Sequence, residues 1–179
     1  MDAYKLNFTV LELKLFSFLC TKTGEKLSQR EIAKDLNVSP TAVSNAVKRL
    51  AGKNLVKIEK TKTINFVTLN RDNYKAVELK RVENLKQIYT SGLSDFLEEQ
   101  LAGSTIILFG SYSRGEDTKS SDIDIAVVGR KEKVLEYERF EKFLNREINI
   151  QFYNAWKGIH KNLRNNILNG IILSGSVEL

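Results

Sequence analysis

The sequence predicts an α+β protein in two parts: a helical first part that ends in a β-hairpin, and a small α/β second part with a mixed sheet. Apolar residues recur at helical spacing behind two capping boxes in residues 9–50, whereas β-prone runs alternate with helical patterns after residue 103. The charge divides in the same way. Residues 1–90 hold 17 Lys and Arg against 9 Asp and Glu, a net charge of +8, and residues 91–179 hold 11 against 13, a net charge of −2.

This uneven charge indicates nucleic-acid contact by the first half only. Other classes of protein are excluded by composition. No apolar run approaches the roughly 18 residues of a membrane span, and the N-terminus lacks the pattern of a signal peptide. Cys20 is the only cysteine, which excludes an internal disulfide framework and a multi-cysteine zinc site. We therefore expect a cytoplasmic protein.

Capping boxes mark the first two helices. Thr9 is followed three residues later by Glu12, and Ser28 by Glu31, so that each pair can satisfy the free amides of a helix start. The first helix is expected to carry an apolar set that comprises Val10, Leu13, Leu15, Phe16, Leu19 and Cys20. The second helix is expected to be short, with its inward residues being Ile32, Ala33 and Leu36.

A third helix and a hairpin follow. Ser39 caps a helix whose first position is Pro40, where the missing N–H does no harm, and which ends near Gly52. Its buried stripe is expected to comprise Ala42, Val43, Ala46, Val47 and Leu50. Residues 55–59 and 64–69 alternate as strands around a basic turn, which predicts a hairpin.

Together, the short helix, tight turn, second helix and basic hairpin resemble the winged helix-turn-helix DNA-binding family over about residues 8–70. The resemblance implies that residues 40–50 form the recognition helix and that the hairpin is a wing which holds the DNA backbone. The side chains expected to contact double-stranded DNA are Thr41, Ser44, Asn45, Lys48, Lys60 and Lys62. The alternative is the same fold used as a protein-binding or dimerising module, and the charge of +8 argues against it.

Three domain segments are expected: a winged helix in residues 1–71, a helical linker in 72–91 and a second domain in 92–179. The linker has an apolar side with Tyr74, Val77, Leu85 and Ile88, and it is also a candidate homodimer contact. The second domain is expected to contain further helices at residues 93–101, 133–145 and 155–168, a strand at 148–152 and a short strand after Gly170.

Residues 105–128 carry the strongest functional pattern. A buried strand stops at Gly110-Ser111, and Asp122-Ile123-Asp124 follows ten residues later in a second β-prone run. Side chains alternate along a strand, so both carboxylates face the same way, about 7 Å apart. Such a pair suits Mg²⁺ with substrate phosphates. The glycine lets a ligand approach the backbone, the serine can hold phosphate oxygens, and Arg114 and Lys119 can reach a triphosphate. The alternative is a hairpin with two solvent-facing aspartates.

This composite resembles the signature of the polymerase-beta-type nucleotidyltransferases, in particular their minimal prokaryotic branch, and the fused arrangement is of archaeal type. Ser113-Arg114-Gly115 and Ser121 fit that branch as well. The resemblance implies a transfer of a nucleoside monophosphate from an NTP, with ATP expected, to a hydroxyl, with Mg²⁺ or Mn²⁺ as cofactor. Gly110 and Ser111 would hold the triphosphate, and Asp122 and Asp124 the metal. The resemblance also implies an antitoxin-like role beside a HEPN-domain protein.

One position departs from the family pattern. A third carboxylate often lies on a later strand, and here that position falls on Asn149, or on Glu147 if the register shifts by one pair. An amide cannot act as a base and binds a hard cation less well. A transcriptional regulator whose second domain binds a nucleotide with little or no turnover is therefore the alternative function. A pure interaction protein is the third.

Overall fold

The structure is a computed structural model that describes residues 7–178. The chain divides into two compact units between Lys80 and Arg81. This point lies inside one continuous helix, α4 (Tyr74–Thr90), so the three-segment division expected from the sequence stays a prediction. The α+β class is confirmed, because both units combine helices with a sheet. In the part of the chain that the structure describes, no helix is long and apolar enough to cross a membrane.

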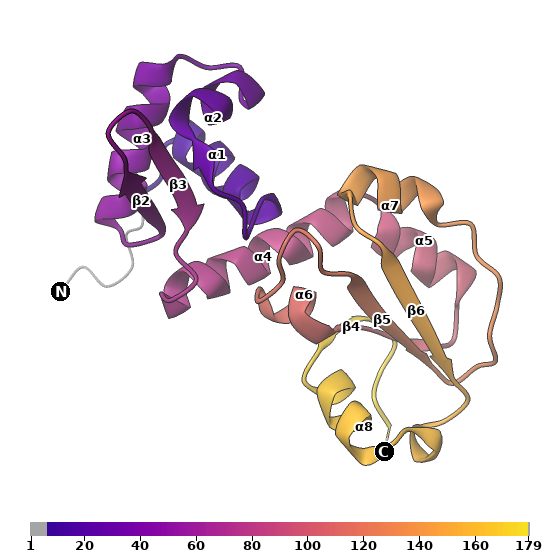
Figure 1. Cartoon of the computed structure of the whole chain (residues 1–179). Helices are drawn as coiled ribbons and strands as arrows, with labels where there is room; N and C mark the ends of the chain where they lie inside the picture. Colours follow the sequence, from indigo (N-terminus) through magenta and orange to yellow (C-terminus); the bar gives the residue numbers. More distant parts are fainter. Residues whose placement is uncertain (1–6, 179) are drawn as a thin grey trace. The chain divides into compact units, whose positions relative to one another are not determined.

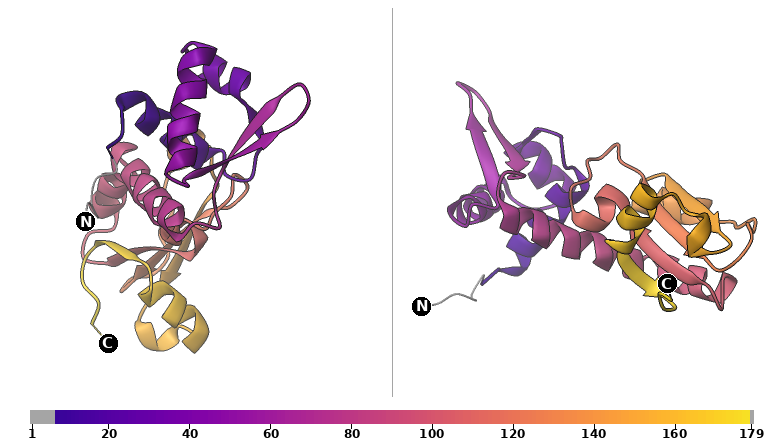
Figure 2. Two further views of the ribbon diagram at one scale, coloured as in Figure 1. Left: turned by 90° about the vertical axis from the view of Figure 1, so that its left-hand side faces the viewer. Right: turned by 90° about the horizontal axis from the view of Figure 1, so that it is seen from below.

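The first unit contains three whole helices, the part of α4 up to Lys80 and a small antiparallel sheet. Its elements in chain order are α1 (Val10–Thr21), β1 (Leu27–Ser28), α2 (Gln29–Asp35), α3 (Pro40–Gly52), β2 (Val56–Lys60) and β3 (Asn65–Leu69). The sheet order is β1-β3-β2. The helix starts agree with the sequence, because both capping boxes form and the hydroxyl of Ser39 accepts from the amide of Ala42 at 3.2 Å. Figure 2 shows the hairpin of β2 and β3 projecting from the helices of this unit.

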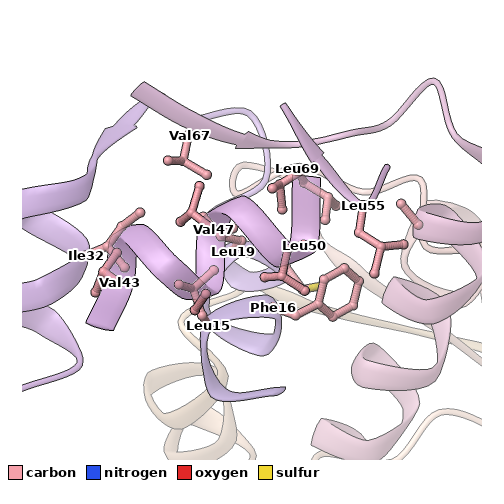
Figure 3. Close-up of a cluster of buried hydrophobic side chains, with 14 of the residues drawn as sticks. Leu15, Phe16, Leu19, Ile32, Val43, Val47, Leu50, Leu55, Val67 and Leu69 are labelled. Carbon is pink, nitrogen blue, oxygen red and sulfur yellow. The ribbon is translucent and has the colours of Figure 1, made fainter. Parts of the chain in front are cut away.

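The core of the first unit lies between its three helices and its sheet (Figure 3). Its labelled side chains are Leu15, Phe16, Leu19, Ile32, Val43, Val47, Leu50, Leu55, Val67 and Leu69. Two members of the apolar set predicted for α1 are not part of this core: Val10 is 71% exposed and Leu13 is 48% exposed. The first turn of α1 instead buries Glu12, which is 1% exposed.

The second unit is built around a four-stranded sheet. Its helices are α5 (Leu93–Gln100), α6 (Gly110–Arg114), α7 (Glu138–Leu144) and α8 (Lys161–Leu168), with a 3₁₀ turn at Trp156–Gly158. Its strands are β4 (Thr105–Phe109), β5 (Ile123–Val128), β6 (Ile148–Tyr153) and β7 (Ile171–Ser174). The strand order is β6-β5-β4-β7 (Figure 1). Only β5 and β6 are parallel to each other, so the predicted mixed sheet is confirmed.

The two faces of this sheet are covered by different helices. Ile106 and Leu108 of β4 pack in one cluster with residues of α4, α5 and α7. Ile107 and Phe109 point the other way and pack in a second cluster with Ile167 of α8. Because Ile123 and Ile125 lie in the first cluster and Ala126 in the second, alternation along β5 assigns Asp124 to the face that α8 covers.

Two helices predicted in the second unit are too long. The helix expected over residues 133–145 is α7, which begins only at Glu138, and Val134 before it is 92% exposed. The helix expected over residues 155–168 is divided into the 3₁₀ turn and α8. Apolar side chains at helical spacing misled the prediction, since no side chain caps the start of α7 or of the 3₁₀ turn. Tyr74, predicted on the apolar side of α4, is 77% exposed.

Glu12 connects α1 to the end of α3 through charged hydrogen bonds. Its carboxylate accepts from Lys53 at 3.0 Å, from Arg49 at 3.3 Å and from the amide of Thr9 at 3.2 Å. Burial by itself raises the pKa of Glu12, but the bonds from Lys53, Thr9 and Arg49 outweigh it and hold the pKa below the ordinary value of 4.5. The ionised carboxylate therefore stabilises the first unit.

We predict that Glu12→Gln lowers the stability of the first unit by about 1–3 kcal/mol at pH 7. A lowered folded pKa gives a contribution that is complete above the unfolded value and is lost as the pH falls through the folded one. The difference from wild type should therefore shrink in acid, which melting curves at pH 7 and pH 3 would show. The control is Glu59→Gln, whose exposed carboxylate pairs with Lys26 at 2.6 Å and should matter little. A loss that is independent of pH would contradict the role of the charge.

Candidate functional site

The sheet register aligns three residues of the candidate site. Phe109 at the end of β4 pairs with Asp124, and Asp124 pairs with Asn149 on the other side. The side-chain amide of Asn149 donates to Oδ1 of Asp124 at 3.3 Å. Asn149, at the position where the family resemblance leads us to expect a third carboxylate, therefore lies beside Asp124 and carries an amide in place of a carboxylate. Glu147 is exposed and precedes β6, so no shift of register brings it opposite Asp124.

Gly110 lies directly against the Asp124 carboxylate. Its φ of 75° is in the left-handed region, where an L-residue costs roughly 1–2 kcal/mol. A Cβ atom at this position would collide with Oδ2 of Asp124 and lie 3.2 Å from its Cγ. The backbone can therefore turn from β4 into α6 at this point only without a side chain. This contact places the Gly110-Ser111 turn and Asp124 next to each other.

The electrostatics of Asp124 reflect a partly enclosed carboxyl. Burial raises its pKa above the ordinary value of 3.8, and the neighbouring Asp122 carboxylate raises it further. The hydrogen bond from Asn149 and the charge of Arg114 act in the opposite direction. Two carboxylates that repel each other at one end of a strand gain free energy when a cation binds between them.

The other candidate residues surround this pair on two sides. Asp122 is exposed and immediately precedes β5, while Ser111 is half-buried in the first turn of α6. Arg114 donates to Glu116 at 2.7 Å and to Asn166 of α8 at 3.0 Å, so it contributes charge to Asp124 while bound elsewhere. Lys119 lines a groove together with Asp122 and the end of α7.

The donor set is consistent with a divalent metal site. Asp122, Asp124 and Asn149 all offer oxygen atoms, which are the ligands of Mg²⁺ and Mn²⁺. In residues 7–178, however, no three or more His, Cys, Asp and Glu side chains gather into a metal-binding group. Asn149, the position at which the family resemblance leads us to expect a third carboxylate, carries an amide and so does not count toward such a group.

A buried polar network beside the site was not predicted from the sequence. It comprises Asn84 of α4, Asp117 in the loop before β5, and Arg146 before β6, which are 3%, 1% and 9% exposed. Their separation along the chain left no local pattern to detect. The only signal was an acidic residue in a loop rich in hydroxyl groups, which has no special meaning before the fold is known.

The first unit presents its candidate DNA-contact residues on one side of α3. Thr41, Asn45 and Lys48 are exposed and Ser44 is half-buried. The opposite side of α3 buries Val43, Ala46, Val47 and Leu50, which confirms most of the predicted stripe. Lys60 and Lys62, near the turn of the hairpin, are exposed.

A small groove of the first unit adds a cationic residue that sequence reasoning missed. Arg30 in the first turn of α2 lines this groove together with Pro40 at the start of α3 and residues 63–65 of the hairpin. The starts of two helices and the hairpin thus line one groove. The sequence did hold one signal for Arg30: a cation in the first turn of a helix is unfavourable beside the helix dipole, so its presence there calls for another reason.

Two family models match the chain, one in each half. Residues 3–80 match the model described as the sugar-specific transcriptional regulator TrmB, and residues 91–174 match the nucleotidyltransferase domain. The chain fuses a TrmB-type winged-helix domain to a nucleotidyltransferase domain. The winged-helix domain is of a kind found in DNA-binding regulators, and nucleotidyltransferase domains in general use an NTP and a divalent metal. No curated protein matches this chain.

Solved structures show only a distant likeness. A ZitR variant from Lactococcus lactis is 19% identical with a TM-score of 0.41, and the match covers 56% of this chain and 66% of that chain, which is less than two thirds of its length. A GntR family transcriptional regulator from Listeria monocytogenes is 19% identical with a TM-score of 0.32, over 56% of this chain and 90% of that chain. At these values, neither likeness bears on the function of the chain.

The contact at Gly110 yields a prediction, for which Gly92 serves as the control because it has a similar backbone conformation. Gly92 has a φ of 77°, but a Cβ atom there would meet nothing within 4 Å. Gly110→Ala and Gly92→Ala should therefore each lose stability by a similar amount, because both place an alanine in the left-handed region. Gly110→Ala should lose about 1 kcal/mol more, because the Asp124 carboxylate must turn away from Asn149. Urea unfolding of both variants measures the difference, and equal losses would contradict the close approach.

Proposed function

We propose that this protein is a DNA-associated enzyme that transfers a nucleoside monophosphate from an NTP, with ATP as the expected donor, to a hydroxyl group. The observation that carries the proposal is the contact of Gly110 with Asp124, since it brings a phosphate-binding turn and an acidic pair together. In the reaction, the acceptor oxygen bonds to the α-phosphorus, pyrophosphate leaves, and the acceptor proton passes to solvent.

Each residue of the site has a proposed role. Gly110 permits a phosphate to approach the backbone, and the hydroxyl of Ser111 donates to its oxygens. Arg114 and Lys119 place positive charge near the triphosphate from two sides. Asp122 and Asp124 hold a divalent cation, Mg²⁺ or Mn²⁺, with Asn149 as a weak third ligand.

Positioning and electrostatics would supply most of the rate. A bound divalent cation would neutralise charge on the phosphates and on departing pyrophosphate. The chain itself would orient the triphosphate through Gly110 and Ser111, so that the acceptor oxygen can approach the α-phosphorus in line. Arg114, which Glu116 and Asn166 hold in place, would stabilise negative charge at no cost of reorganisation.

The transfer is tested with ATP labelled at the α-phosphate, Mg²⁺ and candidate acceptor proteins. We expect Asp122→Asn and Asp124→Asn to reduce labelling by at least about 100-fold, on the scale of other losses of preorganised charge stabilisation. The control is Asp95→Asn, which removes an exposed carboxylate of α5 and should leave transfer unchanged. Equal labelling by the wild type and both site variants would contradict the enzyme.

A second candidate function is favoured by Asn149. Its amide donates to Asp124, whereas a carboxylate there would bind metal and accept protons. In this alternative, the protein is a transcriptional regulator whose second domain binds a nucleotide with little or no turnover. It would give a nucleotide-dependent rise in melting temperature without release of pyrophosphate.

The alternative predicts that Asn149→Asp tightens Mn²⁺ binding and creates or increases turnover, because it restores a third carboxylate beside Asp124. Mn²⁺ titration and pyrophosphate release measure the two effects. Asn154→Asp is the matched control, since it adds the same charge at an exposed position just after β6. If Asn149→Asp changes neither metal affinity nor rate, position 149 is not part of the metal site.

For the winged-helix domain, we propose that α3 reads double-stranded DNA through Thr41, Ser44, Asn45 and Lys48. The hairpin would contact phosphates through Lys60 and Lys62. Support comes from their exposure and from the charge of +8 on residues 1–90. Phosphate contacts of this kind release counterions, so binding should weaken as salt rises.

We predict that removing Lys48, Lys60 and Lys62 together, each by substitution to Ala, weakens binding to a duplex of unrelated sequence. The salt slope should fall by about one for each lysine that contacts a phosphate. Fluorescence anisotropy at several salt concentrations measures both effects. Lys14→Ala, at an exposed position of α1, is the control for lost charge. Binding that does not respond to salt would contradict a lysine–phosphate interface.

Partners of the protein are also proposals. The acceptor hydroxyl would belong to a HEPN-type protein, in an antitoxin-like pairing, as the family resemblance implies. A homodimer through α4 is compatible with Tyr74, Val82 and Tyr89, which are 77%, 61% and 47% exposed. DNA and ATP would both be met in the cytoplasm.

A further inference from the structure

A buried polar network in the second unit connects the segments that carry the candidate site. Asn84 comes from α4, Asp117 from the loop between α6 and β5, and Arg146 from the turn before β6. All three are buried, with Asp117 only 1% exposed. Polar groups at this depth cost free energy unless they find partners, so the segments that supply those partners are favoured in the arrangement seen here.

The contacts of this network converge on the backbone of the site. The Asn84 amide donates to the carbonyl of Tyr112 in α6 at 2.9 Å and to Oδ1 of Asp117 at 2.7 Å. The Arg146 guanidinium lies 3.6 Å from Oδ2 of Asp117 and also donates to the carbonyl of Lys119. The helix that begins with Gly110-Ser111 and the loop that ends at Asp122 are thus held by the same buried groups.

At its start the loop is tied to α6, because the amide of Glu116 donates to the carbonyl of Ser111 at 3.0 Å. Residues 115–122 form no helix or strand. Their local hydrogen bonds join Thr118 to Ser121, amide to hydroxyl at 3.0 Å and carbonyl to amide at 3.1 Å. The amide of Ile123 then donates to the carbonyl of Glu147 at 2.8 Å, directly after Arg146. Asp122 is therefore placed between the pairing of β5 with β6 on one side and the loop that this network contacts on the other.

We infer that Asp117 and Arg146 are positioning residues of the metal–nucleotide site, which hold the loop so that Asp122 and Asp124 face one ligand. The inference rests on the proposed function. Both residues act through the loop backbone rather than on the reacting atoms. The planar guanidinium of Arg146 pairs with the Asp117 carboxylate at 3.6 Å and donates to the Lys119 carbonyl at the same time, an arrangement that a lysine ammonium cannot reproduce with the same geometry.

The test compares Arg146→Lys with Arg139→Lys in the full chain. Arg139 is an exposed arginine of α7 whose guanidinium lies over the ring of Phe140, 4.6 Å from its centroid. We expect Arg146→Lys to raise the dissociation constant of MgATP by at least about 10-fold, the scale of lost outer-shell support. It should also raise the Mg²⁺ concentration at which ATP binding is half-complete (the Mg²⁺ midpoint). In the protein without nucleotide, it should speed hydrogen exchange in residues 115–122. DNA affinity should stay the same, and Arg139→Lys should change none of these readouts.

Asp117→Asn is the second variant in case Arg146→Lys does not fold, and the same changes are expected of it. MgATP affinity and Mg²⁺ midpoint equal to wild type in a folded variant would overturn the inference. Wild-type protein that binds no MgATP would overturn the proposed nucleotide site instead. Hydrogen exchange then decides the positioning separately: faster exchange confined to residues 115–122 supports it, and unchanged exchange in both variants overturns it.

Discussion

The candidate site depends on the register in which three strands meet at Asp124. Phe109 pairs with Asp124 and Asp124 with Asn149, so the turn that follows β4 begins beside the carboxylate. A shift of one residue would turn Asp124 into the cluster that α5 and α7 cover and remove the site. The apolar alternation of β4 and β5, which divides their side chains between two clusters, makes that shift costly. The same burial that stabilises the sheet thus fixes the geometry of the site.

The side chains beside this strand register carry two negative charges, those of Asp122 and Asp124, and one amide, that of Asn149. Asp122 and Asp124 repel each other, and that repulsion favours a cation. Asn149 donates a hydrogen bond to Asp124, and an amide attracts a cation less strongly than a carboxylate and does not act as a base. Nucleotide binding makes smaller demands on the site than turnover. We therefore propose that this amide decides between the two candidate functions, the enzyme and the nucleotide-binding regulator.

Most of the fold was predictable because its signals are local. Capping residues such as Thr9, Ser28 and Ser39 define helix starts from neighbours three residues away, and the strand–turn pattern at Gly110 is contiguous. The errors at residues 133–137 and 155–160 arose where apolar side chains recur at helical spacing but no side-chain cap forms. The network of Asn84, Asp117 and Arg146 joins residues 27 to 33 positions apart. Such long-range partners appear only once the sheet order is known.

The most direct test of the site is a crystal structure of the protein with Mn²⁺ and a non-hydrolysable ATP analogue. The anomalous signal of manganese locates the cation independently of any assumption about the ligand. Our account predicts one manganese peak between the carboxylates of Asp122 and Asp124, with the phosphates against Gly110 and Ser111. A manganese peak elsewhere, or a nucleotide bound away from this pair, would contradict it.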